Sequence, residues 1–201
     1  MEPKTRVGAG RVSRNDGGSK GKTVLGCYTL KNHSNFQGQV SVLNEQAKKT
    51  LLRKIPHGLY VCGVKDGDDL NGFTASWVMQ ASFQPPLVVN CVKNDSISHA
   101  MVKASGVFAL SFLEAGQKDM AQNFFKPLRR VGNKFEDIEF YLAPETGCPV
   151  IKDTLGYVEC RVVGSVEYGD HTVFVGEVVG AELHRDGDPL LLESTGWNYG
   201  G

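Results

Sequence analysis

The chain lacks long hydrophobic runs and any excess of charge of one sign. None of its apolar stretches approaches the roughly 20 residues that a membrane-spanning helix needs, and its first residues contain no signal-peptide core. Its 22 basic and 22 acidic residues cancel, so global charge does not favour a nucleic acid or an anionic surface. We therefore expect no membrane span and no nucleic-acid partner.

The chain lacks paired cysteines: its five cysteines lie far apart, at Cys27, Cys62, Cys91, Cys148 and Cys160. They form no C-x-x-C motif and have no zinc-type spacing with histidine. This pattern predicts free thiols, a reducing compartment such as the cytoplasm, and no metal site.

The first 43 residues differ in composition from the rest. Residues 1–31 carry seven Lys or Arg against two acidic residues. We predict a basic, Gly/Ser-rich leader over 1–43, disordered in part, and a folded domain over 44–201. Two alternatives stay open: a remnant of a transit peptide, which would place the protein in the plastid stroma, or a contact for an anionic partner.

Residues 71–99 are the most informative stretch. Apolar and polar side chains alternate from 71 to 83, which predicts one long, half-buried β-strand. Pro85-Pro86 then ends the pairing, because proline has no N–H to donate, and 87–92 is an apolar run typical of a core strand. The hydroxyl-rich segment after it predicts a short helix through Ala104. Together these elements could hold an extended ligand with a phosphate at the helix start.

The remaining pattern predicts more antiparallel strands. Residues 155–168 and 171–183 form two long strands around Gly169-Asp170, which is a tight-hairpin signal. The 24 glycines suit a turn-rich β protein, and no βαβ rhythm occurs. We predict a mainly β fold of seven or eight strands, closed or nearly closed into a barrel, with short helices at its ends.

Several segments then resemble one family, in order and in spacing. They are Thr74-Ala75-Ser76, Ser82 before Pro85-Pro86-Leu87-Val88, Cys91 before Ser96-x-Ser98-His99, and the hairpin and terminal turn over 169–178 and 186–190. The stretch from about 45 to 199 resembles the flavin-reductase-like proteins of the FMN-binding split-barrel fold. The resemblance implies an antiparallel split β-barrel of Greek-key type.

The resemblance also implies a flavin site. Thr74, Ala75, Ser76 and Trp77 would meet the ring edge and ribityl chain, and Ser82 and Phe83 would lie beside the ring. Ser96, Ser98 and Lys93 would hold the phosphate. Other residues assigned to the site are Cys91, as a small buried side chain, and Asn94, His99 and Lys134. Relatives often carry a basic residue where Asn94-Asp95 stand here, which leaves the choice between FMN and FAD open.

The function implied is hydride transfer from NADH or NADPH to the flavin N5, with His171 positioning the nicotinamide against the flavin. A homodimer and an acceptor protein or oxygenase are the implied partners. The alternative is a non-catalytic flavin- or tetrapyrrole-binding module that serves as an electron relay or an assembly or regulatory partner.

Overall fold

The structure is a computed structural model, and it describes residues 42–200. The predicted leader over 1–43 lies almost wholly outside these residues, and its boundary stays a prediction. From Leu43 onward the chain forms one unit. Its elements in chain order are α1 (Glu45–Leu52), β1 (Tyr60–Asp66), β2 (Asp69–Ala75), β3 (Val78–Ser82), β4 (Leu87–Lys93), α2 (Ile97–Ser105), β5 (Val107–Phe112), α3 (Lys118–Asn123), β6 (Arg130–Val131), β7 (Lys134–Phe135), β8 (Ile138–Leu142), β9 (Pro149–Ile151), β10 (Gly156–Glu167), β11 (His171–Leu183) and α4 (Leu192–Thr195).

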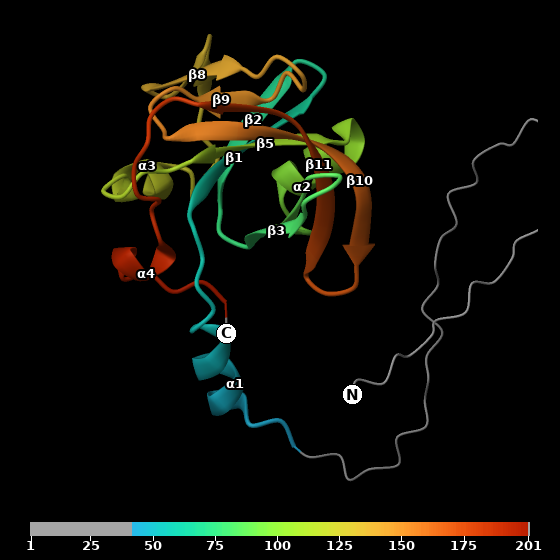
Figure 1. Cartoon of the computed structure of the whole chain (residues 1–201), viewed down its shortest axis with the longest axis vertical. Helices are drawn as coiled ribbons and strands as arrows, with labels where there is room; N and C mark the ends of the chain where they lie inside the picture. The colour runs from blue at the N-terminus through green and yellow to red at the C-terminus, as the bar shows by residue number, and fades with distance from the viewer. Residues whose placement is uncertain (1–41, 201) are drawn as a thin grey trace, which may run out of the picture. The chain divides into compact units, whose positions relative to one another are not determined.

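Seven strands make one antiparallel sheet in the order β2-β1-β5-β10-β11-β4-β3. Its two edge strands, β2 and β3, are consecutive in the chain and are joined by Ser76-Trp77 alone, so the sheet curls until its edges approach at this corner. A smaller sheet of β6, β7, β8 and β9 packs beside it (Figure 1). This confirms the mainly β split barrel.

The prediction of one strand over 71–83 was wrong. β2 pairs with β1, whereas β3 pairs with β4 on the opposite edge, so the chain must leave one edge before it joins the other. Trp77, the second residue of this crossing, is held at the edge formed by β3 and β4, because its carbonyl accepts a hydrogen bond from the Cys91 amide of β4 (3.0 Å). The alternation of side chains continues through the break, which is why the pattern did not reveal it.

Local patterns predicted other elements well. β10 and β11 pair from Gly156↔Leu183 to Glu167↔Thr172 around the predicted Gly169-Asp170 turn. The predicted short helix after β4 is α2, which ends at Gly106 with a left-handed φ of 69°. α2 buries Met101 and Val102 in the core of the large sheet, together with side chains of β1, β5 and β10.

A second core lies between β1, α3 and the smaller sheet, around Phe124, Phe135 and Phe140. β1 therefore has buried residues on both faces. Gly63 is required there, because a Cβ at this position would lie 1.8 Å from the Pro149 carbonyl oxygen.

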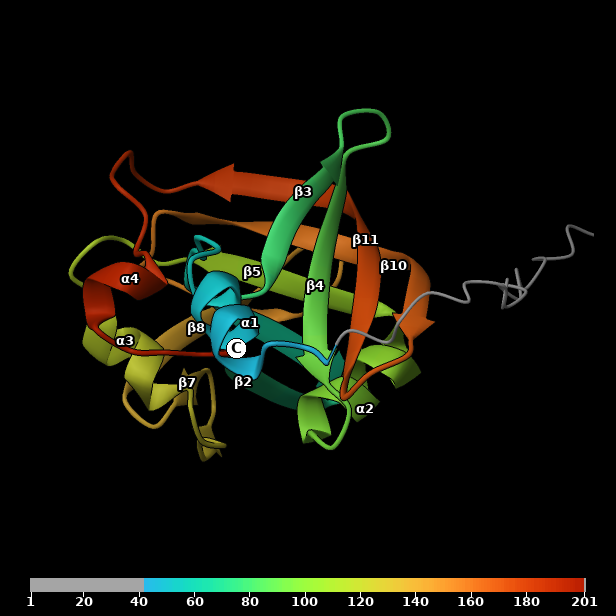
Figure 2. The same cartoon turned by 90° about the horizontal axis from the view of Figure 1, so that it is seen from below.

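The β3–β4 hairpin extends past the rest of the sheet (Figure 2), and α1 lies below the barrel in the view of Figure 1. α1 begins with an Asn44 cap and has no buried residue. Among the described helices none is long and apolar enough to span a membrane.

Candidate flavin site

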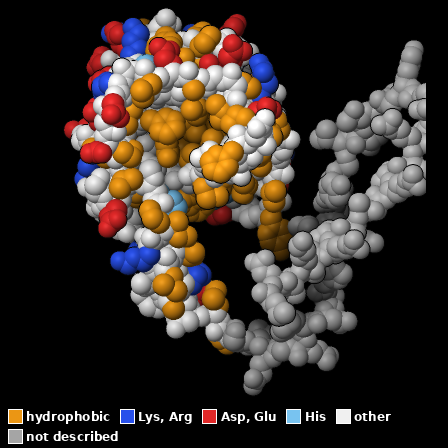
Figure 3. All heavy atoms as spheres, in the orientation of Figure 1, with side chains coloured by type: hydrophobic (Ala, Val, Ile, Leu, Met, Phe, Trp, Pro, Cys, Tyr) orange, Lys and Arg blue, Asp and Glu red, His pale blue; other side chains and the backbone are white. Residues whose placement is uncertain are grey.

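A cavity of about 550 Å³ opens where the two sheet edges approach. Its wall comes from the end of β2, the Ser76-Trp77 crossing, the end of β4, the start of α2, Phe124-Phe125 after α3, and the C-terminal segment. Figure 3 shows hydrophobic side chains gathered in the middle of the face drawn there, with charged side chains around its edge. A volume of this size is typical of a site for a small organic ligand.

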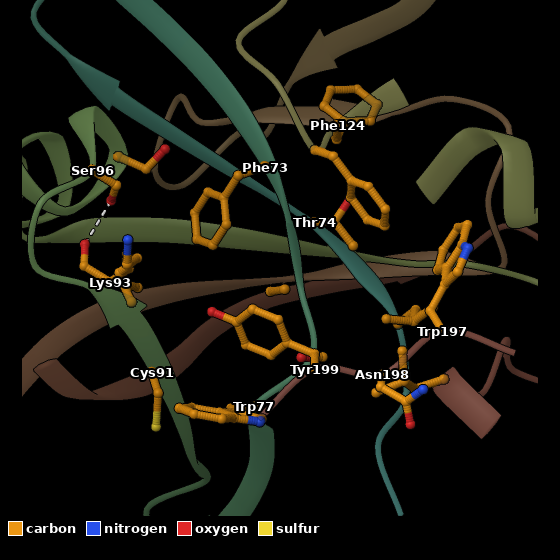
Figure 4. A pocket seen from close by; sticks show the side chains of 17 residues that line it. Phe73, Thr74, Trp77, Cys91, Lys93, Ser96, Phe124, Trp197, Asn198 and Tyr199 are labelled. Carbon is orange, nitrogen blue, oxygen red and sulfur yellow. Dashed lines mark hydrogen bonds between the residues drawn. The ribbon is translucent and has the colours of Figure 1, made fainter. Parts of the chain in front are cut away.

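The cavity has an aromatic end and a polar end. In Figure 4, Ser96 and Lys93 lie on one side, Trp197 and Asn198 lie on the other, and Trp77 and Tyr199 lie between them. Eight of the predicted residues line it: Thr74, Ala75, Ser76, Trp77, Cys91, Lys93, Ser96 and Ser98.

The polar end is the N-terminus of α2. Ser96 is its N-cap: Ser96 Oγ accepts from the His99 amide (3.1 Å) and donates to the Lys93 carbonyl (2.7 Å). This hydroxyl is therefore already used within the chain. The amides of Ile97 and Ser98, in the first turn, have no acceptor among the described residues. These two N–H groups, at the positive end of a helix, fit a phosphate better than the hydroxyls do.

Lys93 is the only basic residue among those that line this described cavity. Its ammonium pairs with the Asp95 carboxylate at 3.0 Å, and the hydrogen bond to Asp95 raises the pKa of Lys93. Both side chains are exposed, so the pair is weak. Asp95 competes with any phosphate for this ammonium.

Replacing Asp95 with Asn is expected to tighten the binding of a flavin phosphate about threefold, because Lys93 is released and one negative charge is removed. Fluorescence titration with FMN measures this change. Riboflavin, which has no phosphate, is the matched control and should bind equally to both proteins. An Asp95→Asn protein that binds FMN more weakly would contradict this placement of the phosphate.

Asn94 and His99 do not line the cavity but brace its polar end. Asn94 Nδ2 donates to the Gly169 carbonyl (2.9 Å), and Asn94 Oδ1 accepts from Thr172 Oγ1 (2.8 Å). His99 Nε2 also bonds to Thr172 Oγ1 (2.8 Å). Because Thr172 is fully buried, these bonds tie the turn before α2 to β11. Ligand contact by Asn94 or His99 stays a prediction.

Thr74 lines the aromatic end of the cavity, but its hydroxyl, like that of Ser96, already forms a hydrogen bond within the chain. Thr74 Oγ1 donates to the Ala121 carbonyl, and the Thr74 amide donates to the Phe124 carbonyl (3.2 Å). These bonds fix α3 and the following Phe124 against β2. The Thr74 side chain therefore shapes the cavity instead of offering a free hydroxyl to it.

Cys91 is half-buried in the cavity wall, and burial raises the pKa of its thiol. It behaves as a small apolar wall residue. Among the described residues, no group of three or more His, Cys, Asp or Glu could hold a metal.

His171 stands directly behind the cavity wall. Its ring centroid lies 4.6 Å from that of Trp77, and Nε2 bonds to Tyr199 OH (2.9 Å). Nδ1 bonds to Asp170 Oδ1 (2.8 Å), and this hydrogen bond lowers the pKa of the Asp170 carboxyl. In the neutral imidazole, Nδ1 then carries the proton and Nε2 accepts from the tyrosine. We call His171, Trp77 and Tyr199 the aromatic clasp.

Three predicted residues lie away from the cavity. Ser82 and Phe83 occupy the tip of the β3–β4 hairpin, where Phe83 is 90% exposed. Lys134 lies in the smaller sheet and pairs with Glu139 at 3.4 Å. None of the three lines the cavity of this chain. The geometry of a single chain does not support their assignment to the flavin site. That assignment stays a prediction.

Sequence reasoning did not assign the C-terminal wall to the site. Trp197, Asn198 and Tyr199 line the cavity, and Trp197 packs on Phe125 with centroids 4.8 Å apart. Arg53 Nε, at the end of α1, donates to the Gly200 carbonyl (3.1 Å). The sequence feature that could have indicated this wall is the pair of aromatic residues, Trp197 and Tyr199, in the C-terminal segment.

The fold and cavity define a split-barrel protein with a nucleotide-sized site, aromatic at one end and suited to an anion at the other. The chain belongs to the flavin reductase like domain family, which matches residues 52–199.

Individual relatives agree with this membership. An NADH-dependent FAD reductase of Streptomyces globisporus is 38% identical over 127 residues, which cover 63% of this chain and 69% of the relative. The FMN reductase (NADH) SmoA of Agrobacterium fabrum is 33% identical over 149 residues, 74% of this chain and 82% of the relative. The structure of BorF, the flavin reductase component of a bacterial two-component tryptophan halogenase, matches with a TM-score of 0.66 and 28% identity, over 75% of this chain and 93% of that one.

Proposed function

We propose that this protein is an NAD(P)H-dependent flavin reductase that uses FMN as its flavin. The observation that carries the proposal is one cavity that joins the aromatic clasp to the unpaired amides of α2. A flavin mononucleotide has these two ends, a flat ring system and a phosphate. When bound, the flavin supplies the hydride acceptor at its N5.

The chain's own residues have binding and orienting roles. The amides of Ile97 and Ser98, with Lys93, would hold the phosphate. The backbone of Ala75 and Ser76 and the rings of Trp77 and Phe124 would receive the ring system, since Ala75 and Ser76 are buried in the wall. His171 would set the position of Trp77 and Tyr199, and hence the space left for a nicotinamide.

Binding of the flavin is the first test. The fluorescence of FMN should be quenched when FMN is added to the purified protein, and binding should saturate at one FMN per chain. Lumichrome, which has the ring but no ribityl phosphate, serves as the comparison and should bind more weakly. A protein that takes up neither FMN nor FAD would overturn the proposal.

We further propose a homodimer, because two exposed apolar side chains mark the β3–β4 hairpin, at an edge of the sheet that the described residues form. Met79 is 64% and Phe83 is 90% exposed. The double variant Met79→Glu/Phe83→Glu is expected to shift the protein to monomer in light scattering coupled to gel filtration. Leu183→Glu, an exposed site at the end of β11, is the control and should leave the mass unchanged. A monomeric wild-type protein, or a double variant that stays dimeric, would contradict this interface.

The relatives support two further proposals. Reduced flavin would leave for an acceptor such as an oxygenase, as BorF belongs to a two-component halogenase. A reducing compartment such as the cytoplasm suits the cysteines of residues 42–200, Cys62, Cys91, Cys148 and Cys160, whose thiols are free.

A further inference from the structure

Thr172 lies between the two ends of the candidate flavin site without lining the cavity itself. It is the second residue of β11 and is fully buried. Its Oγ1 lies 2.8 Å from Asn94 Oδ1 and 2.8 Å from His99 Nε2. The end of β4, α2 and the turn between β10 and β11 lie together in this part of the molecule (Figure 2). One hydroxyl group therefore contacts both the turn before α2 and the first turn of the helix.

The protons of this hydrogen-bond chain have one consistent arrangement. A threonine hydroxyl carries a single proton, and an amide oxygen only accepts. Asn94 Nδ2 donates to the Gly169 carbonyl (2.9 Å), so Asn94 Oδ1 faces Thr172 and accepts its proton. Thr172 Oγ1 is then the acceptor for His99, whose Nε2 carries the proton. Donation therefore runs in one direction, from the imidazole through the hydroxyl and the amide to the carbonyl.

Each end of this chain leads to one end of the flavin site. At the α2 end, His99 directly follows Ser98, one of the two residues whose amides would receive the phosphate. At the other end, the Asn94 amide donates to the Asp170 carbonyl (3.0 Å). Asp170 Oδ1 in turn bonds to Nδ1 of His171 in the aromatic clasp (2.8 Å). The placement of the phosphate site relative to the clasp therefore depends on these bonds.

The first turn of α2 is held by side chains from two sides. Ser98 Oγ accepts from Asn71 Nδ2 of β2 (3.0 Å), and His99 Nε2 donates to Thr172 of β11 (2.8 Å). β2 and β11 are not neighbours in the sheet, so the two supports are independent. Without the Thr172 hydroxyl, the bonds to Asn94 and His99 are both lost, and the helix start keeps one of its two side-chain supports.

We propose that Thr172 is a positioning residue that fixes the phosphate-binding amides of α2 against the aromatic clasp, and that its hydroxyl thereby favours FMN over riboflavin. This inference rests on the proposed function and deepens it. The Thr172 side chain acts through its hydrogen-bond partners at both ends of the site, not by contact with the flavin. Binding energy from a phosphate remote from the reacting ring then holds the ring at the clasp, which raises the rate of hydride transfer as well as the affinity.

The test compares FMN with riboflavin, which has the same ring but no phosphate. Thr172→Val keeps the shape of the side chain and removes the hydroxyl. It is expected to weaken FMN about tenfold in a fluorescence titration and riboflavin less than about twofold. At saturating flavin, the ratio of kcat with FMN to kcat with riboflavin should also fall. Thr172→Ser returns the hydroxyl and should restore FMN affinity to within about threefold of the wild type.

Two further variants separate positioning from a general loss of stability. Thr154→Val makes the same change at another fully buried threonine, whose Oγ1 donates to the Ile151 carbonyl (3.0 Å) away from the cavity. It should lower the unfolding temperature and leave the ratio of FMN to riboflavin affinity as in the wild type. His99→Phe keeps a ring against Phe174 but removes the donor to Thr172, so it should weaken FMN about threefold. It also supplies the test if Thr172→Val does not fold.

Two results would overturn the inference alone. One is a Thr172→Val protein, or a His99→Phe protein in its place, that keeps the wild-type ratio of FMN to riboflavin affinity. The other is a Thr154→Val protein that loses this ratio to the same extent. Both results leave the proposed reductase standing, whereas a wild-type protein that binds neither flavin would overturn the proposed function and this inference with it.

Discussion

Replacing Ser96 with aspartate is expected to weaken FMN binding about 100-fold, or by about 2.7 kcal/mol. Aspartate is as good an N-cap as serine, so the cap bond to the His99 amide and the helix itself are retained. The new carboxylate, however, lies beside the two free amides that would receive the phosphate. Two like charges at this distance repel strongly in a partly buried site.

Ser96→Asn is the matched control, since asparagine also caps a helix but adds no charge. It should bind FMN within about threefold of the wild type, and both variants should unfold at temperatures close to that of the wild type. Riboflavin should bind similarly to all three proteins. If Ser96→Asp kept the FMN affinity of the wild type, the phosphate would not lie at the start of α2.

Replacing His171 with alanine is expected to lower kcat/KM for NADH about 100-fold and to weaken FMN binding much less, since only Trp77 among the residues proposed to meet the flavin contacts this histidine. The imidazole contacts two residues of the cavity wall that we propose to face the nicotinamide: its ring centroid lies 4.6 Å from that of Trp77, and Nε2 bonds to Tyr199 OH at 2.9 Å. Without it, Trp77 loses this packing contact and Tyr199 loses this hydrogen bond, so both rings are held less firmly. Loss of geometry at a hydride-transfer site is costly even when binding is retained.

Two variants separate this role from a general structural one. Tyr199→Phe keeps the ring and removes only the hydroxyl, so it should reproduce a smaller part of the loss, about tenfold. His184→Ala changes a histidine that bonds to Tyr141 (2.8 Å), away from the cavity, and should leave kcat/KM unchanged. A His171→Ala protein with the kcat/KM of the wild type for NADH would show that His171 does not position the nicotinamide.

Elements determined by neighbouring residues were predictable from the sequence. The Gly169-Asp170 turn and the hydroxyl-rich start of α2 each act through their own few residues, and both appear where the pattern placed them. The polar end of the site follows from the second of these. What the pattern did not predict is that the Ser96 hydroxyl serves the helix, which leaves the binding role to backbone amides.

Features that depend on distant contacts were not predictable. The break at Ser76-Trp77 exists because β2 and β3 sit on opposite edges of one sheet, which is a property of the whole barrel. The C-terminal wall depends on bonds between Tyr199 and His171 and between Gly200 and Arg53, residues far apart in the chain. Lys134 was chosen for its charge alone, and a sequence does not show that this charge is paired with Glu139 in another sheet.

The most direct test of the central claim is anaerobic mixing of the FMN-loaded protein with NADH or NADPH while the visible flavin absorbance is followed. We expect the flavin bands to bleach at least about 1,000-fold faster than those of free FMN with the same nicotinamide. Bands that persist would contradict the reductase and favour the non-catalytic flavin-binding module.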